Sequence, residues 1–146
     1  MSTLKVTFAR PKVLIVDDDP VFRKAMARLL RELPIDIELA HSGAAALAAV
    51  VDTDFALVLS DVEMHPMDGV ELVAELRGMQ VEVPVVFVSG CDPAEIELRL
   101  ARRGLSGAVP VVSKPVSRNE LVELIQQRLA LVAPALPPPP PVRRDA

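Results

Sequence analysis

Five polar residues follow apolar stretches of this chain, and their chemical types suit a cation and a phosphoryl group. They are three carboxylic acids, one hydroxyl and one amine: Asp17, Asp18, Asp61, Ser89 and Lys114. Carboxylates that lie close together raise one another's pKa unless a cation or a shared proton compensates their charge. Oxygen ligands without a histidine or a thiol favour Mg²⁺ or a similar hard cation. An ammonium, a hydroxyl and a carboxylate near phosphorus are what binding a phosphoryl group requires.

Other polar residues of the same kinds are explained by helix capping. Asp19 and Asp92 each precede a proline, which is favoured as the first residue of a helix. Asp68 and Ser117 each stand three residues before a glutamate, which is the spacing of a capping box. We therefore predict four helix starts here and leave the three carboxylates named above for chemistry.

Short apolar runs alternate with helical patterns between residues 12 and 132. The runs are 13–16, 36–39, 56–59, 85–88 and 109–112. Most of them are of the kind found in strands buried on both faces of a parallel sheet. Apolar residues recur at helical spacing in the segments between and after them, for example Phe22, Met26, Leu29, Leu30 and Leu33, and Leu121, Leu124, Ile125 and Leu129. The alternation predicts an α/β fold, a doubly wound parallel sheet of five strands with five helices.

The edges of this sheet are predicted from two exceptions to the apolar pattern. Residues 36–39 alternate polar and apolar side chains, as a half-exposed edge strand does, and Pro110 cannot donate to a strand ladder. Edges at the second and fifth strands give the order 2-1-3-4-5. The first and third strands are then neighbours, so we expect Asp17, Asp18 and Asp61 to meet in one crevice at the carboxyl ends of the strands.

The composition predicts a soluble, reduced and cytoplasmic protein. The net charge of −4 argues against nucleic-acid binding through this domain. A single cysteine, Cys91, excludes a disulfide within the chain, and no stretch approaches the roughly 20 apolar residues of a membrane span. We expect a short leader at residues 1–11, one domain at 12–132 and a proline-rich disordered tail at 133–146.

Five segments resemble the response-regulator receiver family of two-component signalling, and the resemblance covers nearly all of residues 12–132. The segments are 13–20, 40–47, 60–69, 85–90 and 113–115. They hold the acidic pair, the single aspartate, the serine and a Lys-Pro pair in the order typical of that family. The resemblance implies a flavodoxin-like fold and a phosphoacceptor that works in a two-component system or a phosphorelay.

The resemblance also implies how the phosphoryl group is handled. Asp61 would be the nucleophile, and the donor would be a phosphohistidine of a sensor histidine kinase or a histidine phosphotransfer protein. Lys114 would pair with a phosphoryl oxygen, Ser89 would turn toward the phosphoryl group, and the bond before Pro115 would be a cis peptide. The chain would catalyse its own phosphorylation and slow dephosphorylation, and would not be an enzyme with a separate substrate.

Mg²⁺ is the cofactor that the resemblance implies. Asp18 and Asp61 would bind it directly and Asp17 would act through bound water. The backbone carbonyl of Glu63 would complete the protein ligands.

The route from this chemistry to an output departs from the family. Members commonly have an aromatic residue in the fifth strand where this chain has Val111. No output domain is recognisable, so we expect a single-domain regulator that acts by binding an unknown output protein.

Two other functions stay open at this point. A haloacid-dehalogenase-like Mg²⁺ phosphohydrolase would use Asp17 as nucleophile and Asp19 as acid and base. That chemistry needs acidic metal ligands after the lysine, and only Glu120 and Glu123 follow Lys114 closely, on a predicted helix. The second alternative is a phosphate-independent receiver-like binding module, which the missing aromatic residue keeps open.

Overall fold

The computed structural model, which describes residues 10–107 and 109–129, contains a five-stranded parallel sheet. Its strands are β1 (Lys12–Val16), β2 (Asp36–Ala40), β3 (Leu57–Ser60), β4 (Val85–Ser89) and β5 (Val111–Ser113). They pair in the order β2-β1-β3-β4-β5, so the predicted strand order is confirmed. Within the same residues, five helices join or follow the strands: α1 (Pro20–Leu29), α2 (Gly43–Asp52), α3 (Gly69–Gly78), α4 (Pro93–Ala101) and α5 (Arg118–Arg128).

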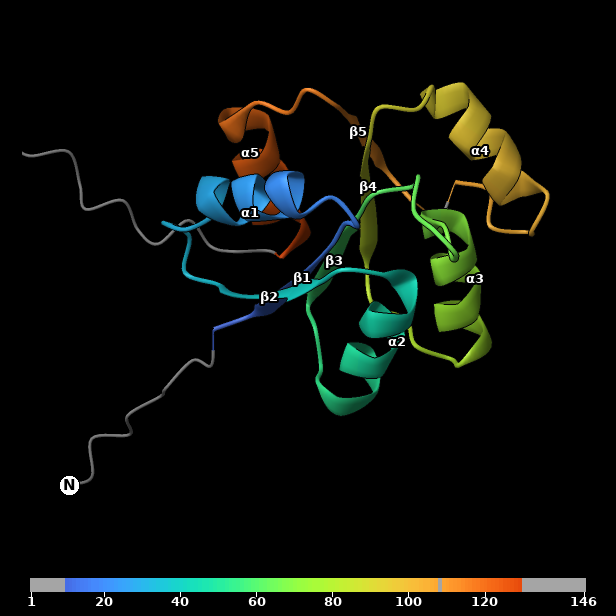
Figure 1. Cartoon of the computed structure of the whole chain (residues 1–146), viewed down its shortest axis with the longest axis horizontal. Coiled ribbons are helices and arrows are strands. Elements are labelled where there is room, and N and C mark those ends of the chain that lie inside the picture. The colour runs from blue at the N-terminus through green and yellow to red at the C-terminus, as the bar shows by residue number, and fades with distance from the viewer. Residues whose placement is uncertain (1–9, 108, 130–146) are drawn as a thin grey trace, which may run out of the picture.

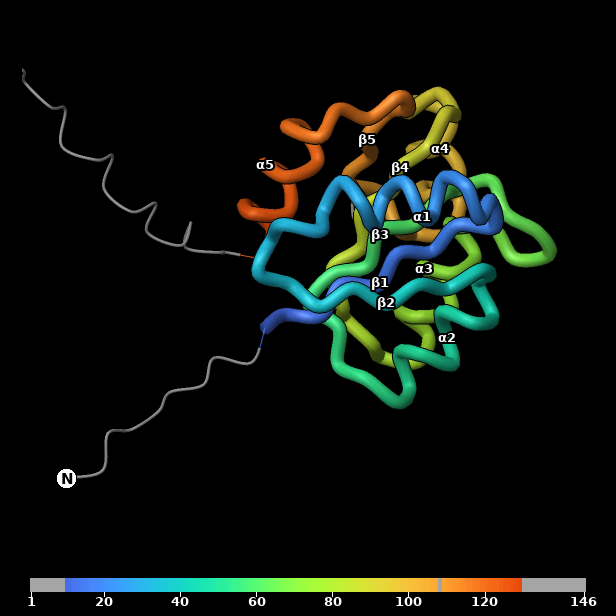
Figure 2. The backbone as a smooth tube through the Cα atoms, turned by 60° about the vertical axis from the view of Figure 1, so that its left-hand side comes forward, coloured from blue at the N-terminus to red at the C-terminus, as the bar shows by residue number. Residues whose placement is uncertain are grey.

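Helices cover both faces of the sheet (Figure 1). α1 and α5 lie on one face, and α2, α3 and α4 lie on the other; Figure 2 shows the same layers after a 60° turn. Each layer has its own apolar core, because successive residues of a strand point to opposite faces. Leu14 and Val16 of β1 pack into the core under α2, α3 and α4, whereas Val13 and Ile15 pack into the core under α1 and α5. The predicted doubly wound fold is confirmed.

Strand bounds differ from the prediction by one or two residues. β3 and β4 end on Ser60 and Ser89, so Ser89 is the last residue of its strand and does not follow it. β5 begins at Val111, two residues later than expected. Pro110 has no N–H for the ladder, but its carbonyl accepts a hydrogen bond from the Phe87 amide at 2.9 Å. The proline therefore supports the edge of the sheet from just outside β5.

Each described helix begins after a capping side chain. The four predicted caps are confirmed, since each accepts a backbone amide of the first turn: Asp19, Asp68, Asp92 and Ser117. Ser42 caps α2 in the same way, which the sequence analysis did not identify. The apolar pattern that predicted the first helix extends to Leu33, but α1 ends at Leu29. Leu30 is its C-cap, and Leu33 lies buried in the turn that follows.

The predicted tail at 133–146 and most of the predicted leader at 1–11 lie outside the described residues. Among the helices that are described, none combines the length and the apolar character needed to cross a bilayer.

Candidate functional site

The pairing of β1 with β3 brings the candidate carboxylates together. Val16 is the register partner of Ser60, and the Asp61 amide donates to the Val16 carbonyl at 3.0 Å. Asp17 and Asp61 therefore leave the two neighbouring strands side by side. Oxygen atoms of Asp17, Asp18 and Asp61 all lie within 4.8 Å of one another. The three carboxylates therefore meet at the carboxyl ends of β1 and β3, as the strand order predicted.

The three carboxylates differ in their exposure to water. Asp17 and Asp61 are only 2% and 8% exposed, whereas Asp18 is an exposed residue. Burial raises the pKa of Asp17, and the neighbouring charge of Asp61 raises it further. The Asp19 amide, which donates to Asp17 Oδ1 at 2.9 Å, and the Lys114 ammonium lower the pKa of Asp17. Burial has the largest effect, so this pKa lies above its ordinary value.

Lys114 supplies positive charge to the crevice. It follows β5 directly, and its amide donates to the Ser89 carbonyl at 2.9 Å, which fixes the end of β5 against β4. Its Nζ lies 3.4 Å from Asp17 Oδ2 and 3.3 Å from Asp61 Oδ2. A single ammonium thus pairs with two carboxylates. The predicted cis peptide between Lys114 and Pro115 is also present.

Backbone contacts fix the orientation of the Asp61 carboxylate. Its Oδ1 accepts the Val62 amide at 2.7 Å and the Glu63 amide at 3.4 Å, while its Oδ2 pairs with Lys114. Gly69, the first residue of α3, packs so closely on the Asp61 carbonyl that a Cβ atom would collide with it. The loop after β3 therefore holds one carboxylate oxygen and leaves the other toward the lysine, while the start of α3 packs on the backbone carbonyl of Asp61.

Ser89 lies at the same edge of the sheet, fully buried at the end of β4. Its Oγ accepts the amide of Cys91 at 3.1 Å, and no hydrogen bond joins it to Asp61 in the described structure. Gly90, between the two, has open space where a side chain would stand. The hydroxyl is therefore within the site region but is bound to its own loop.

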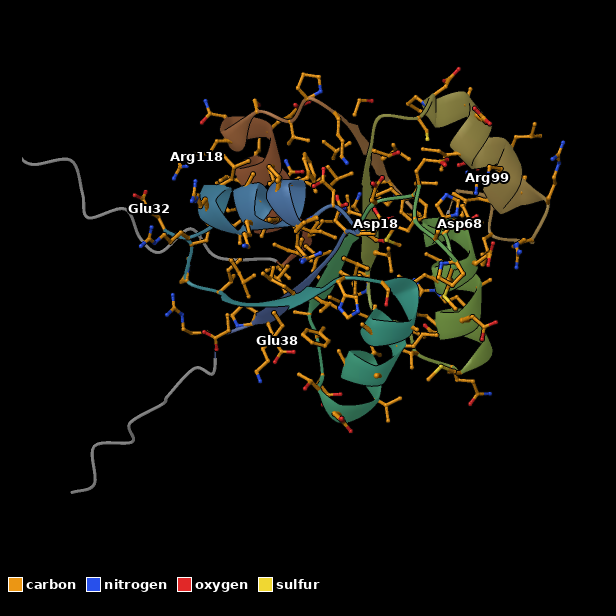
Figure 3. All side chains as sticks on the ribbon, viewed as in Figure 1. Asp18, Glu32, Glu38, Asp68, Arg99 and Arg118 are labelled. Carbon is orange, nitrogen blue, oxygen red and sulfur yellow. The ribbon has the colours of Figure 1, made fainter. Side chains whose placement is uncertain are left out.

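Glu63 lies in the loop after Asp61, and its side chain reaches α4. Its Oε1 accepts the Cys91 thiol at 3.1 Å and pairs with Arg99 at 3.3 Å. Arg99 also pairs with Asp68, the cap of α3, at 2.5 Å, and Figure 3 shows these two side chains between α3 and α4. Burial raises the pKa of Cys91, and the Glu63 carboxylate raises it further. These contacts tie α4 to the loop that carries Asp61.

The carboxylate cluster fits a hard divalent cation. Its donors are carboxylate oxygens alone, and two of the three groups are buried close enough to repel one another. His41 and His65 are exposed residues outside the cluster. Oxygen donors without nitrogen or sulfur are the set that Mg²⁺ prefers, so these three aspartates are a suitable site for it.

Three contributors to this region were not predicted from the sequence. The Phe22 ring lies under Lys114, with 3.7 Å between Nζ and the ring centroid. Arg23 donates to the Asp17 carbonyl at 2.6 Å, and Arg99 makes the contacts to α3 described above. Phe22 was identified only as an apolar helix residue. The one available signal for Phe22 and Arg23 was their position just after the acidic pair.

Comparison with known proteins gives the family. A family model for the response regulator receiver domain matches residues 13–126. The chain is 31% identical over 118 residues to the transcriptional regulatory protein ZraR of Salmonella typhimurium, over 81% of this chain and 26% of ZraR. It is 33% identical over 121 residues to the sensor histidine kinase RcsC of Escherichia coli, over 83% of this chain and 12% of RcsC. The chain therefore spans about a quarter or less of the length of these curated relatives.

A solved structure agrees with the sequence relatives. The receiver domain of the Francisella response regulator 1452 has a TM-score of 0.72 and 27% identity, over 83% of this chain and 98% of that chain. The matched range 13–126 also contains all three aspartates of the cluster, Ser89 and Lys114. On the family match, the structural likeness and the confirmed strand order, the chain belongs to the response regulator receiver domain family.

Proposed function

We propose that this domain accepts a phosphoryl group on Asp61 from a phosphohistidine, with the help of Mg²⁺, and thereby switches its binding to a partner. The orientation of Asp61 is the observation that carries the proposal. Backbone amides hold its Oδ1, while its Oδ2 pairs with the Lys114 ammonium beside two further carboxylates. A nucleophilic oxygen is thus kept apart from the loop amides and next to a cation for the incoming charge.

The proposed transfer moves the phosphoryl group from nitrogen to oxygen. Asp61 Oδ2 attacks phosphorus, a P–O bond forms, and the P–N bond of the phosphohistidine breaks with its electron pair going to the imidazole. The product is a mixed anhydride on Asp61. Lys114, already 3.3 Å from Asp61 Oδ2, donates to a phosphoryl oxygen. Ser89 exchanges its hydrogen bond with the Cys91 amide for one to the phosphoryl group.

Mg²⁺, when bound, neutralises charge on the phosphoryl oxygens. In this proposal Asp18 and Asp61 hold it directly, Asp17 holds it through water, and the Glu63 backbone carbonyl completes the protein ligands. The proximity of the three carboxylates supports the assignment, as does the burial of Asp17 and Asp61.

The proposed donor is a sensor histidine kinase or a histidine phosphotransfer protein, and the proposed output is an unknown protein. Relatives of the chain are named as a sensor histidine kinase and as a transcriptional regulatory protein, which supports a place in such a system. The net charge of −4 disfavours nucleic acid as a direct partner of this domain. A cytoplasmic location suits the exchange and the free thiol of Cys91.

A hydrolase that uses Asp17 as nucleophile is not favoured. Its acid and base would be Asp19, but that side chain caps α1 by accepting the Val21 amide at 2.9 Å. The family match also favours a receiver domain over a hydrolase. A phosphate-independent binding module is kept as an outcome of the following test.

The test is covalent labelling by a small phosphoryl donor. Wild type, Asp61→Asn, Asp17→Asn and the control Asp54→Asn are incubated with phosphoramidate and Mg²⁺ and read by intact mass. Asp54 is an exposed carboxylate before β3, at the opposite end of that strand from Asp61. We expect one acid-labile phosphoryl group on wild type and Asp54→Asn, and none on Asp61→Asn. Labelling that survives Asp61→Asn but not Asp17→Asn would favour the hydrolase, and an unlabelled wild type would favour the binding module.

A further inference from the structure

Phe22 contacts the amine of the site although it is not part of the carboxylate cluster. It lies in the first turn of α1, directly after the loop that carries Asp17 and Asp18. The Lys114 Nζ lies over its ring at 3.7 Å from the centroid. Phe22 and Lys114 are both half-buried. The ring therefore covers one side of an ammonium whose other partners are two aspartates.

The two aspartates alone hold this ammonium loosely. Charge-assisted hydrogen bonds from an ammonium to a carboxylate are usually about 2.7–2.9 Å long. The Nζ distances here are 3.4 Å to Asp17 and 3.3 Å to Asp61. A lysine side chain is flexible and strongly hydrated, so at such distances it can turn toward water. The negative face of an aromatic ring attracts a cation and excludes water at the same time.

The distribution of aromatic residues makes this contact specific. The chain has four phenylalanines and no tyrosine or tryptophan. Of the described ones, Phe55 and Phe87 belong to the core under α2, α3 and α4. Phe22 packs against the opposite core, under α1 and α5, and is the described ring that lies over a cation. The Phe22 ring therefore packs on the apolar core on one side and contacts the Lys114 ammonium on another, apart from Phe55 and Phe87.

We propose that Phe22 is a positioning residue for Lys114. Its ring keeps the ammonium between Asp17 and Asp61, so that the charge is in place before a phosphoryl group arrives. The ring acts through the lysine and takes no part in bond making. The effect on phosphorylation rests on the proposed function, whereas the placement of the ammonium does not.

Three variants separate the ring from other effects of substitution. Phe22→Leu keeps an apolar side chain but removes the ring face, and Phe22→Tyr keeps the ring. Val21→Ala changes the neighbouring residue on the same turn, which is 77% exposed. Thermal unfolding followed by circular dichroism establishes that each variant is folded.

The first measurement is the proton resonance of the Lys114 ε-methylene in lysine-labelled protein without donor, assigned by its loss in Lys114→Arg. A methylene over a ring face is shifted upfield by the ring current. We expect that upfield shift in wild type, Phe22→Tyr and Val21→Ala, and its loss in Phe22→Leu. An unchanged resonance in Phe22→Leu would overturn the proposal, whether or not the protein accepts a phosphoryl group.

The second measurement is the rate of Asp61 labelling by phosphoramidate at saturating Mg²⁺. We expect Phe22→Leu to be about three- to tenfold slower, and Phe22→Tyr to restore the rate. At about 1.4 kcal/mol per tenfold this is about 0.7 to 1.4 kcal/mol, within the range of a cation over a ring. A wild-type rate in Phe22→Leu, with the resonance moved, would show that the ring touches the lysine without positioning it and would refute the proposal. If wild type takes no phosphoryl group, the proposed function fails and the resonance decides on Phe22 alone.

Discussion

Two ionic networks flank the loop of the candidate acceptor, and they differ in their exposure to water. On the β5 side, Lys114 bridges Asp17 and Asp61, with side chains 24%, 3% and 10% exposed. On the α4 side, Arg99 bridges Glu63 and the cap of α3, with side chains 27%, 63% and 21% exposed. Water screens the second network more than the first, mainly because the Glu63 side chain is largely exposed. The two networks therefore differ in the strength of their charge interactions, although in each of them one cation pairs with two carboxylates.

The difference in exposure suggests different roles for the two networks. A buried ion pair gains little net stability, because taking its charges out of water offsets their attraction. The network around Lys114 thus adds little net stability, and fixed charges of this kind are what the proposed phosphoryl transfer would need. The network around Arg99 joins α4 to α3 at low cost, because its charges stay partly hydrated. The following predictions test this division.

Removing the ammonium that pairs with the two buried carboxylates should have the largest effect. Lys114→Met leaves Asp17 and Asp61 close together without a counter-charge, so we expect a loss of about 2 kcal/mol in the free energy of unfolding at pH 7. Urea unfolding measures it, and Mg²⁺ should restore part of the loss by binding the folded state. Lys114→Arg, which keeps the charge, is the control. A stability equal to that of wild type would remove the distinction between the two networks.

Removing one buried carboxylate should have a smaller effect, of opposite sign and dependent on pH. Folding raises the pKa of Asp17 above its ordinary value of 3.8, mainly through burial, so the native state holds this proton more tightly than the unfolded chain does. The resulting stability is fully present below pH 3.8 and is lost as the pH rises through the folded-state pKa. Asp17→Asn has no such group to ionise.

We therefore expect Asp17→Asn to gain stability relative to wild type as the pH rises from 3.8 toward neutrality without Mg²⁺, by less than Lys114→Met loses. Urea unfolding at a series of pH values measures the difference. A difference that stays constant with pH would mean that burial does not perturb Asp17, and the buried network would then resemble the exposed one.

Removing charge from the network around Arg99 should have the smallest effect. Asp68→Asn keeps a capping oxygen for α3 but loses the ion pair with Arg99, so we expect a loss of about 0.5 kcal/mol that disappears in high salt. Asp68→Ala loses the cap as well and should cost about 1 kcal/mol more. Thermal unfolding at low and high salt compares the two variants. Equal losses in both would show that the ion pair, and not the cap, holds the start of α3.

Much of the fold and the meeting of the carboxylates could be predicted from local sequence. Strands buried on both faces read as apolar runs, and a parallel sheet brings the residues after neighbouring strands to one edge. That rule was enough to place Asp17 beside Asp61. Helix caps such as Asp68 and Ser117 are equally local, because each side chain accepts a hydrogen bond from the first turn of the helix that it precedes.

The remaining contacts depend on packing between distant segments. Phe22 reaches Lys114 only because the fold brings the first turn of α1 to the loop after β5. No spacing in the chain encodes that contact. Arg99 reaches Glu63 and Asp68 through the packing of α4 on α3. The start of β5 was misplaced because Val109 and Val112 have the same apolar character, while the missing N–H of the proline between them shortens the strand.

Gly69 sets the distance between the start of α3 and the carboxyl end of β3. Its amide donates to the Val62 carbonyl at 2.8 Å, and no side chain separates it from the carbonyl of Asp61. A methyl group here would push α3 away from the end of β3, and would carry along Asp68 and the helix that Arg99 ties to it. The backbone of α3 therefore contacts the backbone of the loop after β3 directly at this point. Any displacement of the Asp61 backbone must therefore displace the start of α3 as well. The absence of a Cβ atom at Gly69 thus couples the position of this helix to that of the candidate acceptor.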